Sequence, residues 1–566
     1  MQIFRVALVA IGMASAGFPI VAQEADQGAR LLEETLRERE IEALARSQAG
    51  QEISTPDIEG PVAETPCFPV DTITVMGNTV YTEAELASVV SAFSGQCLGE
   101  TSIGNLLAGI TALYADAGYI TTRAYVPSQD LSTGGLSIDV LEGRIEAYEY
   151  QRSETSDMAN PDGPLGIGSV MPQRPEEVFQ LRDLEHGLEQ MNRLRSTEVN
   201  ANLIAGEAPG TSRIVLTETR VDAVRGTFGI NTQGDEITGR RQVSFGLEAD
   251  NLLSLYDTWS LRYSGSRDSN ALAFGVSAPY RRWLFSLNGS YSEELTPVTA
   301  NSDLFTQTAN ANLTVERLLF RDARSKYFAH ATLSSYWNER YINIAALTPQ
   351  HRSAFRVGLR QEHRFEDAVI LMDTALSVGT GALGADRDAS NLPAGSPRTD
   401  FTALDASLTY IRPLENGRQL SVSAVGKLSN RPLFGNEQLS IGGWNSVRGY
   451  EGSGAGGDNG LYVRTELAFP TIAIDADGWT DFSAMRELDL FRDIRGGIRP
   501  FAFLDAGYVH SRATERDTSL AGAGIGISAQ LGRTTLNATL ATPLLDADGH
   551  DAGSLQAYIG IEVKAF

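Results

Sequence analysis

From about residue 221 to the C-terminus, apolar and polar residues alternate with a period of two. Residues 259–264 read Trp-Ser-Leu-Arg-Tyr-Ser, and residues 271–276 and 283–288 alternate in the same way. One apolar face against one small or polar face is typical of a strand with lipid outside and water inside. A soluble β-sandwich would also alternate. The roughly 345 residues from 221 to 566 have room for about sixteen strands, an even number.

The connections between these segments are unequal in length, which favours a barrel over a sandwich. Short links at 279–281 and at Gly532 alternate with long polar ones at 293–303, 379–398 and 430–459. In a membrane barrel, short turns at one rim alternate with longer loops at the other. The link 472–495 is longer than a turn should be, and the pattern does not explain it.

Two smaller α/β modules precede the barrel. Residues 67–141 have a β-α-α-β-β rhythm, with strands at 70–75, 120–126 and 136–141. Thr82 and Glu85 form a capping box for the first helix, and the second helix stops at Gly118. The rhythm recurs more loosely over 142–220, around a helix at 181–194. Two such modules in tandem favour a scaffold for a partner chain rather than a catalytic domain.

The N-terminus predicts a signal peptide over residues 1–22, with a cationic Arg5, an apolar stretch at 6–20 and cleavage after Ala22. That stretch is shorter than the roughly 20 residues of a spanning helix, although a membrane anchor is the alternative. Residues 23–50 predict a charged helix whose Leu32/Leu36 stripe is narrow, so it belongs in water or in a water-filled channel. A solvated tail is the alternative interpretation. Residues 51–66, rich in proline, are a linker.

Composition excludes several classes of function. The net charge of −25 argues against nucleic acid as a partner. Six scattered histidines offer no ligand spacing for a metal, and no nucleotide-binding loop or nucleophile-and-base set stands out, so we expect no cofactor and no enzymatic activity. The two cysteines, Cys67 and Cys97, predict one disulfide in an exported chain, with two free thiols as the alternative.

Two motifs near the C-terminus are candidates for a contact inside the barrel. Val447-Arg448-Gly449-Tyr450 stands in a glycine-rich loop, and Phe503-x-Asp505-x-Gly507 stands in an alternating strand. Phe503, Asp505 and Gly507 share one strand face, which should line the lumen because a carboxylate is costly in hydrocarbon. The alternatives are a solvated loop charge for Arg448 and a turn residue at a strand end for Asp505.

In this order and context, the motifs resemble those of the two-partner secretion transporters (TpsB proteins) of the haemolysin secretion/activation type, in the superfamily of barrels with POTRA domains. The resemblance spans the mature chain. Its first module matches in Cys67-Phe68, in 118–123, in 125–130, in 136–140 and in 142–145; its second matches in 182–185 and 188–194. The barrel matches in Gly442-Gly443, in 447–450 and in the motif that contains Asp505.

The resemblance implies a transmembrane β-barrel of about sixteen antiparallel strands, preceded by two periplasmic α/β POTRA domains and an N-terminal plug helix, in the outer membrane of a Gram-negative bacterium. The implied domains are a signal peptide (1–22), a plug helix (23–50), a linker (51–66), POTRA domains at 67–141 and 142–220, and a barrel (221–566). In this family the sixth surface loop folds back into the lumen, which implies an ion pair between Arg448 and Asp505. Outer-membrane barrels often end in an outward phenylalanine, but strict alternation turns Phe566 inward here unless the terminus bulges.

The implied function is export of an unfolded secreted partner through the pore, without nucleotide hydrolysis and after recognition by the POTRA domains. The implied partner is a β-helical protein of the TpsA type with an N-terminal secretion domain. Outer-membrane lipid, periplasmic chaperones and the barrel assembly machinery are further implied partners. The alternatives are an assembly or insertion factor of the same superfamily, which usually has more POTRA domains, and a passive porin, which needs none.

Overall fold

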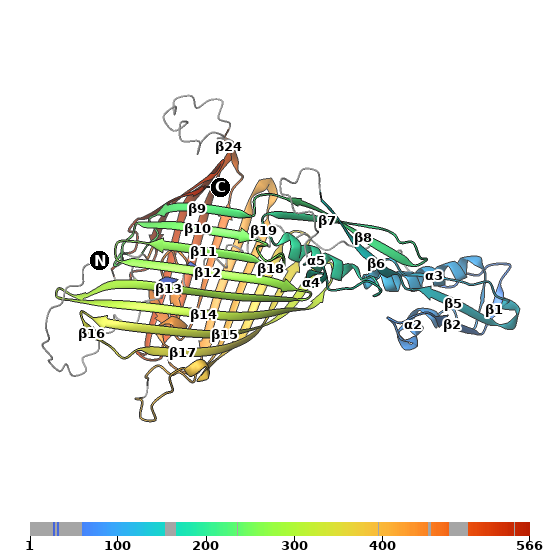
Figure 1. The fold of residues 1–566 in the computed structure, drawn as a ribbon, viewed down its shortest axis with the longest axis horizontal. Helices are drawn as coiled ribbons and strands as arrows, with labels where there is room; N and C mark the ends of the chain where they lie inside the picture. The colour runs from blue at the N-terminus through green and yellow to red at the C-terminus, as the bar shows by residue number, and fades with distance from the viewer. Residues whose placement is uncertain are drawn as a thin grey trace.

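The computed structural model describes residues 27, 28, 31, 32, 59–152, 166–234, 236–393, 395–450, 454–474, 496–547 and 549–565. A closed β-barrel forms one part of the molecule, and two small α/β domains extend from one of its ends (Figure 1). We call this the POTRA end of the barrel and the other the loop end. The predicted signal peptide, most of the predicted plug helix, most of the link 472–495 and Phe566 lie outside the described residues.

The first POTRA domain packs two helices on a small mixed sheet. Its elements are β1 (Phe68–Val70), β2 (Thr72–Met76), α2 (Glu83–Val90), β3 (Gln96–Leu98), α3 (Glu100–Asp116), β4 (Arg123–Tyr125) and β5 (Gly135–Leu141). Strand β5 lies between β2, to which it is parallel, and β4, to which it is antiparallel. The capping box predicted for α2 is confirmed, since Thr82 accepts from the Glu85 backbone while Glu85 accepts from that of Thr82. Buried Leu106, Ile110 and Ile138 form the centre of the core.

The second POTRA domain has the sheet order β6–β8–β7 and one long helix. Its elements are β6 (Arg144–Arg152), α4 (Ile167–Val170), α5 (Leu181–Asn192), β7 (Thr197–Ala205) and β8 (Thr211–Arg220). Gln180 caps helix α5, since its side chain accepts a hydrogen bond from the backbone N–H of Asp183. Phe179, Met191 and Leu216 are fully buried between the helix and the sheet.

The barrel is closed by sixteen long antiparallel strands within the described residues. They are β9 (Val224–Asn231), β10 (Gln242–Asp250), β11 (Thr258–Gly265), β12 (Ser269–Tyr280), β13 (Trp283–Thr299), β14 (Ser302–Arg321), β15 (Ser325–Ile342), β17 (Gln350–Arg364), β18 (Val369–Thr380), β19 (Thr402–Pro413), β20 (Gln419–Ser429), β23 (Asn459–Ala468), β25 (Gly496–Ser511), β26 (Arg516–Leu531), β27 (Thr534–Pro543) and β28 (Gln556–Lys564). Short β16 (Ala345–Ala346) and β24 (Ile472–Ile474) extend the hairpins of β15 and β25. The pairing of β28 with β9 closes the cylinder.

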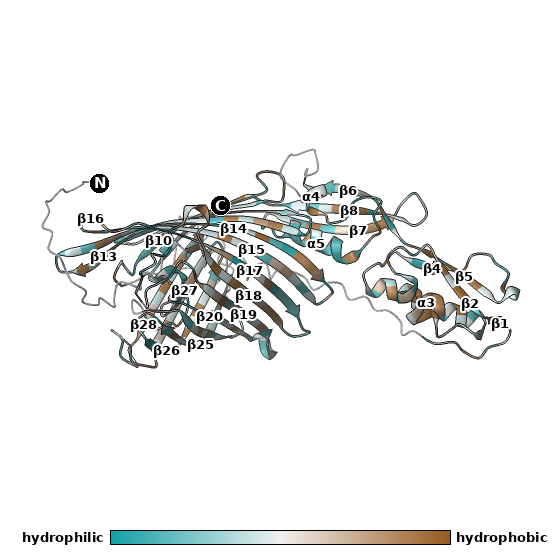
Figure 2. Cartoon of the chain, turned by 90° about the horizontal axis from the view of Figure 1, so that it is seen from below, coloured by the Kyte–Doolittle hydropathy of each residue, from teal (hydrophilic) through white to brown (hydrophobic). Residues whose placement is uncertain are grey.

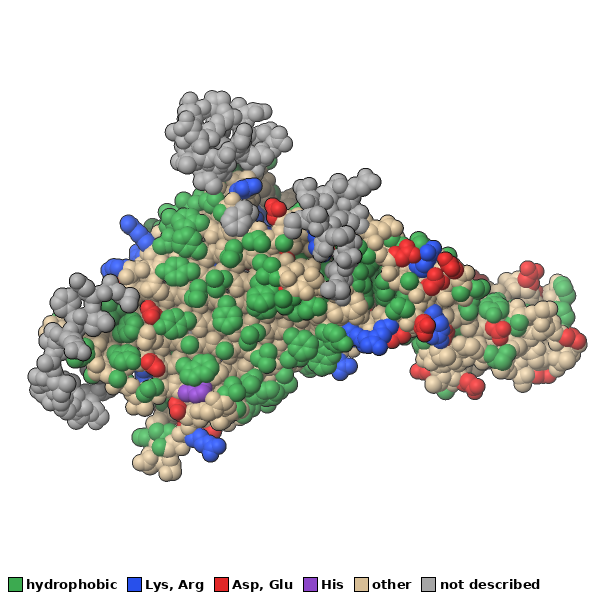
Figure 3. Space-filling view, in the orientation of Figure 1, with side chains coloured by type: hydrophobic (Ala, Val, Ile, Leu, Met, Phe, Trp, Pro, Cys, Tyr) green, Lys and Arg blue, Asp and Glu red, His purple; other side chains and the backbone are tan. Residues whose placement is uncertain are grey.

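The alternation of apolar and polar residues becomes the difference between the outer and inner faces of this cylinder. On β12, Leu272 and Phe274 are exposed on the outside, whereas Ala271 and Ala273 are buried inside. Strand hydropathy alternates along the wall in Figure 2, and apolar side chains cover the barrel in Figure 3, whereas acidic ones gather on the POTRA domains. Among the described residues, no helix is long and apolar enough to cross a membrane.

Three segments predicted from the sequence have different bounds in the structure. The link predicted at 293–303 is mostly strand, because β13 and β14 continue to Thr299 and Ser302 and leave only a tight turn. Pro297 and the polar composition of this segment suggested a loop, but β13 and β14 extend their pairing there. The strand predicted at 70–75 is divided into β1, which pairs with β3, and β2, which pairs with β5, while the strand predicted at 120–126 is reduced to β4.

The second POTRA domain and the barrel share a hydrophobic core. The turn between β10 and β11 (residues 251–257) places Tyr256 in the core of this domain with Val170 and Phe179. Tyr256 is 0% exposed and has a positive φ of 56°. The side-chain Oδ1 of Asn251 accepts a hydrogen bond from the backbone N–H of Tyr256 at 2.8 Å. This bond supports the uncommon backbone conformation of Tyr256.

Candidate functional site

The long connection between β20 and β23 (residues 430–458) folds into the barrel. It contains a short hairpin, β21 (Leu439–Ile441) paired with β22 (Ala455–Gly457). Ile441, Val447 and Tyr450 are each 0% exposed and pack with wall residues of β23, β25 and β26. This segment, which we call the lumen loop, therefore occupies part of the cylinder's interior.

Arg448 and Asp505 meet in the interior and form a bidentate ion pair. Arg448 Nε donates to Asp505 Oδ2 at 2.6 Å, and Nη2 donates to Oδ1 at 3.0 Å. The backbone N–H of Arg448 also donates to Oδ2, at 3.2 Å. The side chains are 2% and 0% exposed. Two parallel bonds of this kind need the planar fork of arginine, which lysine lacks.

Further wall residues complete the surroundings of the guanidinium. Its carbon lies 3.6 Å from the centroid of the Phe503 ring, a close cation–π contact. Nη1 donates to Glu466 Oε2 on β23 at 3.2 Å. The arginine thus faces two carboxylates and an aromatic ring. Sequence reasoning missed Glu466, because a lone glutamate on an alternating strand carries no distinguishing pattern.

The residues that follow Arg448 contact the last strands of the barrel. Gly449 N donates to the Tyr558 hydroxyl on β28 at 3.2 Å. The Tyr450 hydroxyl lies 2.8 and 2.9 Å from the carbonyl oxygens of Ala521 and Leu545, which share its single proton as acceptors. Gly449 has a φ of +102°, and a Cβ there would lie 3.0 Å from the backbone of residues 542 and 543. The whole Val447–Tyr450 motif is therefore docked against the inner wall.

Glycines in the wall make room for the loop. A Cβ on Gly507 would lie 3.0 Å from Val447, so the last position of the Phe503-x-Asp505-x-Gly507 motif allows the close approach. A Cβ on Gly522 of β26 would lie 1.9 Å from the Arg448 carbonyl oxygen. Sequence reasoning missed Gly522, although glycine at 522, 524 and 526 on one strand face was a usable signal of close approach.

The two cysteines lie in the first POTRA domain, far from the lumen loop. Cys67 and Cys97 are joined by a disulfide that spans 30 residues and ties the start of β1 to β3. Glu64, just before this region, accepts backbone hydrogen bonds from Gly99, Thr101 and Ser102 at the start of α3. The hydrogen bonds from Ser102 and then Thr101 lower the pKa of Glu64 to about 2.

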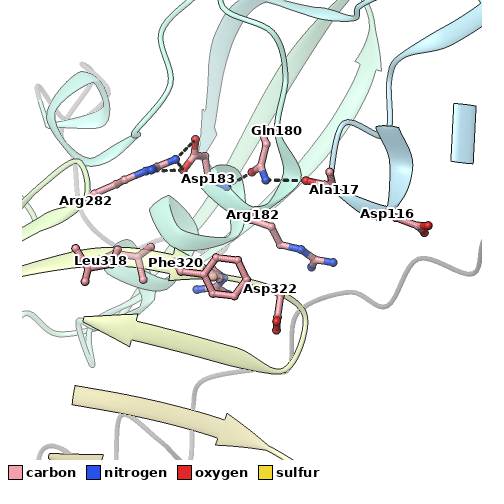
Figure 4. Close-up of a pocket in the computed structure, with 11 residues that line it drawn as sticks. Asp116, Ala117, Gln180, Arg182, Asp183, Arg282, Leu318, Phe320 and Asp322 are labelled. Carbon is pink, nitrogen blue, oxygen red and sulfur yellow. Dashed lines mark hydrogen bonds and ion pairs between the residues drawn. The ribbon is translucent and has the colours of Figure 1, made fainter. Parts of the chain in front are cut away.

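A cleft of about 300 Å³ opens where both POTRA domains meet the barrel (Figure 4). In it, Arg282 from the β12–β13 turn donates to both oxygens of Asp183 on α5, with a shortest distance of 2.6 Å. Gln180 Nε2 donates to the Ala117 carbonyl oxygen of the first POTRA domain at 3.0 Å. Contacts of the second POTRA domain with the first POTRA domain and with the barrel therefore border the cleft.

Charge pairs continue beside this cleft. Arg321 of β14 pairs with Glu185 at 3.3 Å and also with Glu189. Lys326 of β15 pairs with Glu189 and, at 3.2 Å, with Glu362. The two cations lower the pKa of Glu189 to about 2 against the opposing effect of burial. Helix α5 is therefore fixed to the barrel rim by several ion pairs.

Within the part of the chain that the structure describes, no group of three or more His, Cys, Asp or Glu side chains is arranged to hold a metal ion. The interior site consists of a docked loop, an ion pair and a wall.

Comparison with known proteins shows which families have sequences similar to this chain. Residues 210–529 match the haemolysin secretion/activation proteins ShlB/FhaC/HecB, residues 68–143 match the ShlB-type POTRA domain, and residues 144–204 match a second POTRA domain. The outer membrane transporter CdiB of Escherichia coli is 32% identical over 95% of this chain and 89% of its own. The hemolysin transporter protein ShlB of Serratia marcescens is 26% identical over 71% of this chain and 72% of its own.

Solved structures agree with the sequence matches. CdiB from Escherichia coli superimposes with a TM-score of 0.81 at 29% identity, over 95% of this chain and 97% of that one. CdiB from Acinetobacter baumannii, at 19% identity, has the same fold with a TM-score of 0.75, over 95% and 98% of the two chains. The chain is an outer-membrane transporter rather than an enzyme, with its POTRA domains in the periplasm. It belongs to the ShlB/FhaC/HecB family of haemolysin secretion/activation proteins.

Proposed function

We propose that this transporter recognises an unfolded secreted protein of the TpsA type through its POTRA domains and exports it through the barrel without nucleotide hydrolysis. The observation that carries the proposal is an open sheet edge in the second POTRA domain. Strand β7 pairs with β8 on one side only among the described residues. An extended segment of a client can add to such an edge through backbone hydrogen bonds.

The register of β7 identifies which backbone groups the client would use. The N–H and C=O of Val199 bond to the side chain of Asn192, at 2.6 and 2.9 Å, so they point away from β8. Because the orientation of backbone groups repeats every second residue, residues 201, 203 and 205 also point away from β8. Leu203 and Ile204 are 38% and 40% exposed, so the C-terminal half of the strand is accessible.

Export then requires the interior of the barrel to open. The lumen loop would leave its place on the wall, and the client would pass through the space as an extended chain. Folding of the client outside the cell removes the unfolded form from equilibrium and biases movement outward, which substitutes for nucleotide hydrolysis. A passive porin would give the POTRA domains no role in this cycle.

The N-terminal segment 23–50 would close the resting pore together with the lumen loop. Leu31 and Leu32, which are 8% and 7% exposed, pack on Ala271 and Ala273 of the inner wall. Gln27 Nε2 donates to Thr238 Oγ1 at 3.3 Å. These contacts support a plug that leaves when the client arrives, with residues 51–66 as its tether. Deletion of 23–50 should increase the conductance of the protein in planar bilayers.

The edge of β7 provides the test of client recognition. In Leu203→Pro, the lost N–H points away from β8, so the sheet keeps its internal hydrogen bonds while strand addition is blocked. We expect secretion of a TpsA-type client produced together with the transporter to fall about tenfold, with bilayer conductance unchanged. Leu203→Thr keeps the N–H and should secrete normally. Normal secretion by Leu203→Pro would refute recognition at this edge.

A further inference from the structure

Arg352, on the inner face of β17, lies between two aromatic rings. Its guanidinium carbon is 4.3 Å from the centroid of Tyr336, on the neighbouring strand β15, and also 4.3 Å from that of Phe434. Tyr336 belongs to the wall, whereas Phe434 belongs to the first part of the lumen loop. The arginine is therefore a direct link between the wall and the loop.

The environment of Arg352 makes these ring contacts important. The residue is 7% exposed, and its Nε and Nη1 have no hydrogen-bond partner among the described residues. A desolvated guanidinium gains more from an aromatic face than one in water does. Its planar shape also lets it use both faces at once. Loss of the Phe434 ring would leave one face of a nearly buried cation without its aromatic contact.

Neighbouring contacts show that this part of the loop follows the wall. Leu433, which is 1% exposed, packs with Ala354 of β17 and Ala403 of β19. Its backbone N–H donates to Asp458 at 2.6 Å, where the loop returns to the wall. Lys427 Nζ donates to the Glu437 carbonyl oxygen, also at 2.6 Å. Residues 433–437, the loop root, are thus attached at a place distinct from Asp505.

The two attachments lie on separate sections of the cylinder. Arg352 is on β17 and Asp505 is on β25, with β18, β19, β20 and β23 between them. Release of Arg448 from Asp505 would free the tip of the loop but leave its root on β17. We propose that Arg352 is a positioning residue that holds the root of the lumen loop through Phe434, as a second closure of the pore. This proposal rests on the proposed function only in that a client must displace the loop.

The test measures access to the loop root and needs no client. Asn436→Cys introduces the only free thiol, because the two natural cysteines form the disulfide. In this background, Phe434→Leu keeps apolar bulk but removes the ring. We expect Phe434→Leu and Arg352→Ala each to raise the rate of maleimide labelling of purified protein on the order of tenfold. The double variant should label no faster than the singles, because both changes break one contact.

Arg360→Ala is the matched control. Arg360 is also on β17 and stacks 4.0 Å from Phe328, a ring of the wall rather than of the loop, and it pairs with Glu316 at 2.6 Å. Its labelling rate should equal that of the background. Heat-modifiable gel mobility identifies folded barrels, and Phe434→Leu, which leaves the wall intact, serves if Arg352→Ala does not fold. Unchanged labelling in Phe434→Leu, or equal acceleration in Arg360→Ala, would overturn the proposal.

Because labelling is independent of export, the proposal and the proposed function can fail separately. Faster labelling of Phe434→Leu, together with normal secretion by Leu203→Pro, would support the second closure and refute recognition at the β7 edge. Unchanged labelling of Phe434→Leu, together with reduced secretion by Leu203→Pro, would refute the second closure and support recognition at the edge.

Discussion

Arg193 of the second POTRA domain donates a hydrogen bond from Nη2 to the carbonyl oxygen of Tyr256 in the β10–β11 turn, at 2.9 Å. The same guanidinium donates from Nη1 to Ser277 of β12 at 2.7 Å. The ring of Tyr256 also completes the core of this POTRA domain. Both the backbone and the side chain of Tyr256 therefore contact the domain. The second POTRA domain and the barrel are therefore joined at this turn by both hydrogen bonds and packing.

Tyr256→Ala should destabilise the second POTRA domain by about 3–5 kcal/mol, because it removes a fully buried ring and leaves a cavity. Urea-dependent limited proteolysis of the purified full-length protein measures this loss. The control is Tyr256→Phe, which keeps the ring. The Tyr256 hydroxyl has no hydrogen-bond partner among the described residues, so its removal should cost little. Equal losses in the two variants would contradict the role of the ring.

The Arg448–Asp505 pair should behave as a coupled unit. Asp505→Ala removes the bidentate partner of a buried cation and leaves it the single contact with Glu466, whereas Arg448→Ala leaves the buried Asp505 carboxylate without its cation. Each change should weaken loop docking by about 3 kcal/mol. The double variant should lose less than the sum of the two. Maleimide labelling of Ser446→Cys, a position 5% exposed, reports loop release. Additive effects would mean that the two residues act independently.

Arg448→Lys tests the geometry of the pair rather than its charge. Lysine retains the cation but cannot donate from two positions to both Asp505 oxygens. We therefore expect this variant to release the loop nearly as much as Arg448→Ala does. If Ser446→Cys is labelled at the same rate with lysine as with arginine at position 448, charge alone fixes the loop.

Acid should weaken the docking of the second POTRA domain on the barrel. Burial lowers the pKa of His186 from 6.5 to about 4, and its Nε2 lies 3.2 Å from the Arg281 carbonyl oxygen of the β12–β13 turn. The unfolded domain therefore binds a proton at a higher pH than the folded one. The contribution of neutral His186 to the stability of the docked second POTRA domain is fully present above pH 6.5. About 3 kcal/mol of this stability is lost as the pH falls from 6.5 toward 4.

His186→Gln should remove this part of the pH dependence, because glutamine keeps a donor but does not titrate in this range. The comparison with the wild-type protein isolates His186 from its neighbours. Burial raises the pKa of Asp183, which acts in the opposite direction. The pKa of Glu189 is lowered from 4.5 to about 2, so its stabilising contribution is lost below about pH 4.5, in both proteins alike. The measurement is urea-dependent proteolysis at pH 7, 5.5 and 4.5. A His186→Gln protein that loses as much stability as the wild type would contradict the prediction.

Loss of the disulfide should destabilise the first POTRA domain by roughly 3.5 kcal/mol, the chain-entropy value for a loop of 30 residues. Cys67→Ser/Cys97→Ser should shift the urea midpoint for proteolysis within residues 67–141. Reduction of the wild-type protein should reproduce this shift, and reduction of the double variant should change nothing. Barrel heat-modifiability should be unaffected, because the disulfide does not contact the barrel rim.

Local patterns predicted much of the architecture. Period-two alternation predicted which residues face out, as the exposed Leu504 and Tyr508 and the buried Phe503 and Asp505 on β25 show. These patterns are legible because the two faces of a barrel strand meet different solvents. The pairing of Arg448 with Asp505 was predictable for another reason, since both residues stand in motifs that resemble those of a known family.

Contacts between segments distant in sequence could not be predicted in this way. Tyr256 stands in a turn beside the exposed Leu252, Leu253 and Leu255, and its burial depends on the POTRA domain that precedes it in the chain. Arg352 and Phe434 are separated by 82 positions in sequence, and only the closed barrel brings the guanidinium under the ring. Their pairing depends on the three-dimensional path of the loop, which alternation does not encode.

The partners of the lumen-loop tip have a consequence for biogenesis. Tyr450 bonds to Ala521 and Leu545, and Gly449 bonds to Tyr558 on the final strand, so each partner is synthesised after the loop. The tip cannot seat fully until the last hairpin has joined the wall. A half-built cylinder would therefore remain unsealed, and its sealing would mark the completion of assembly.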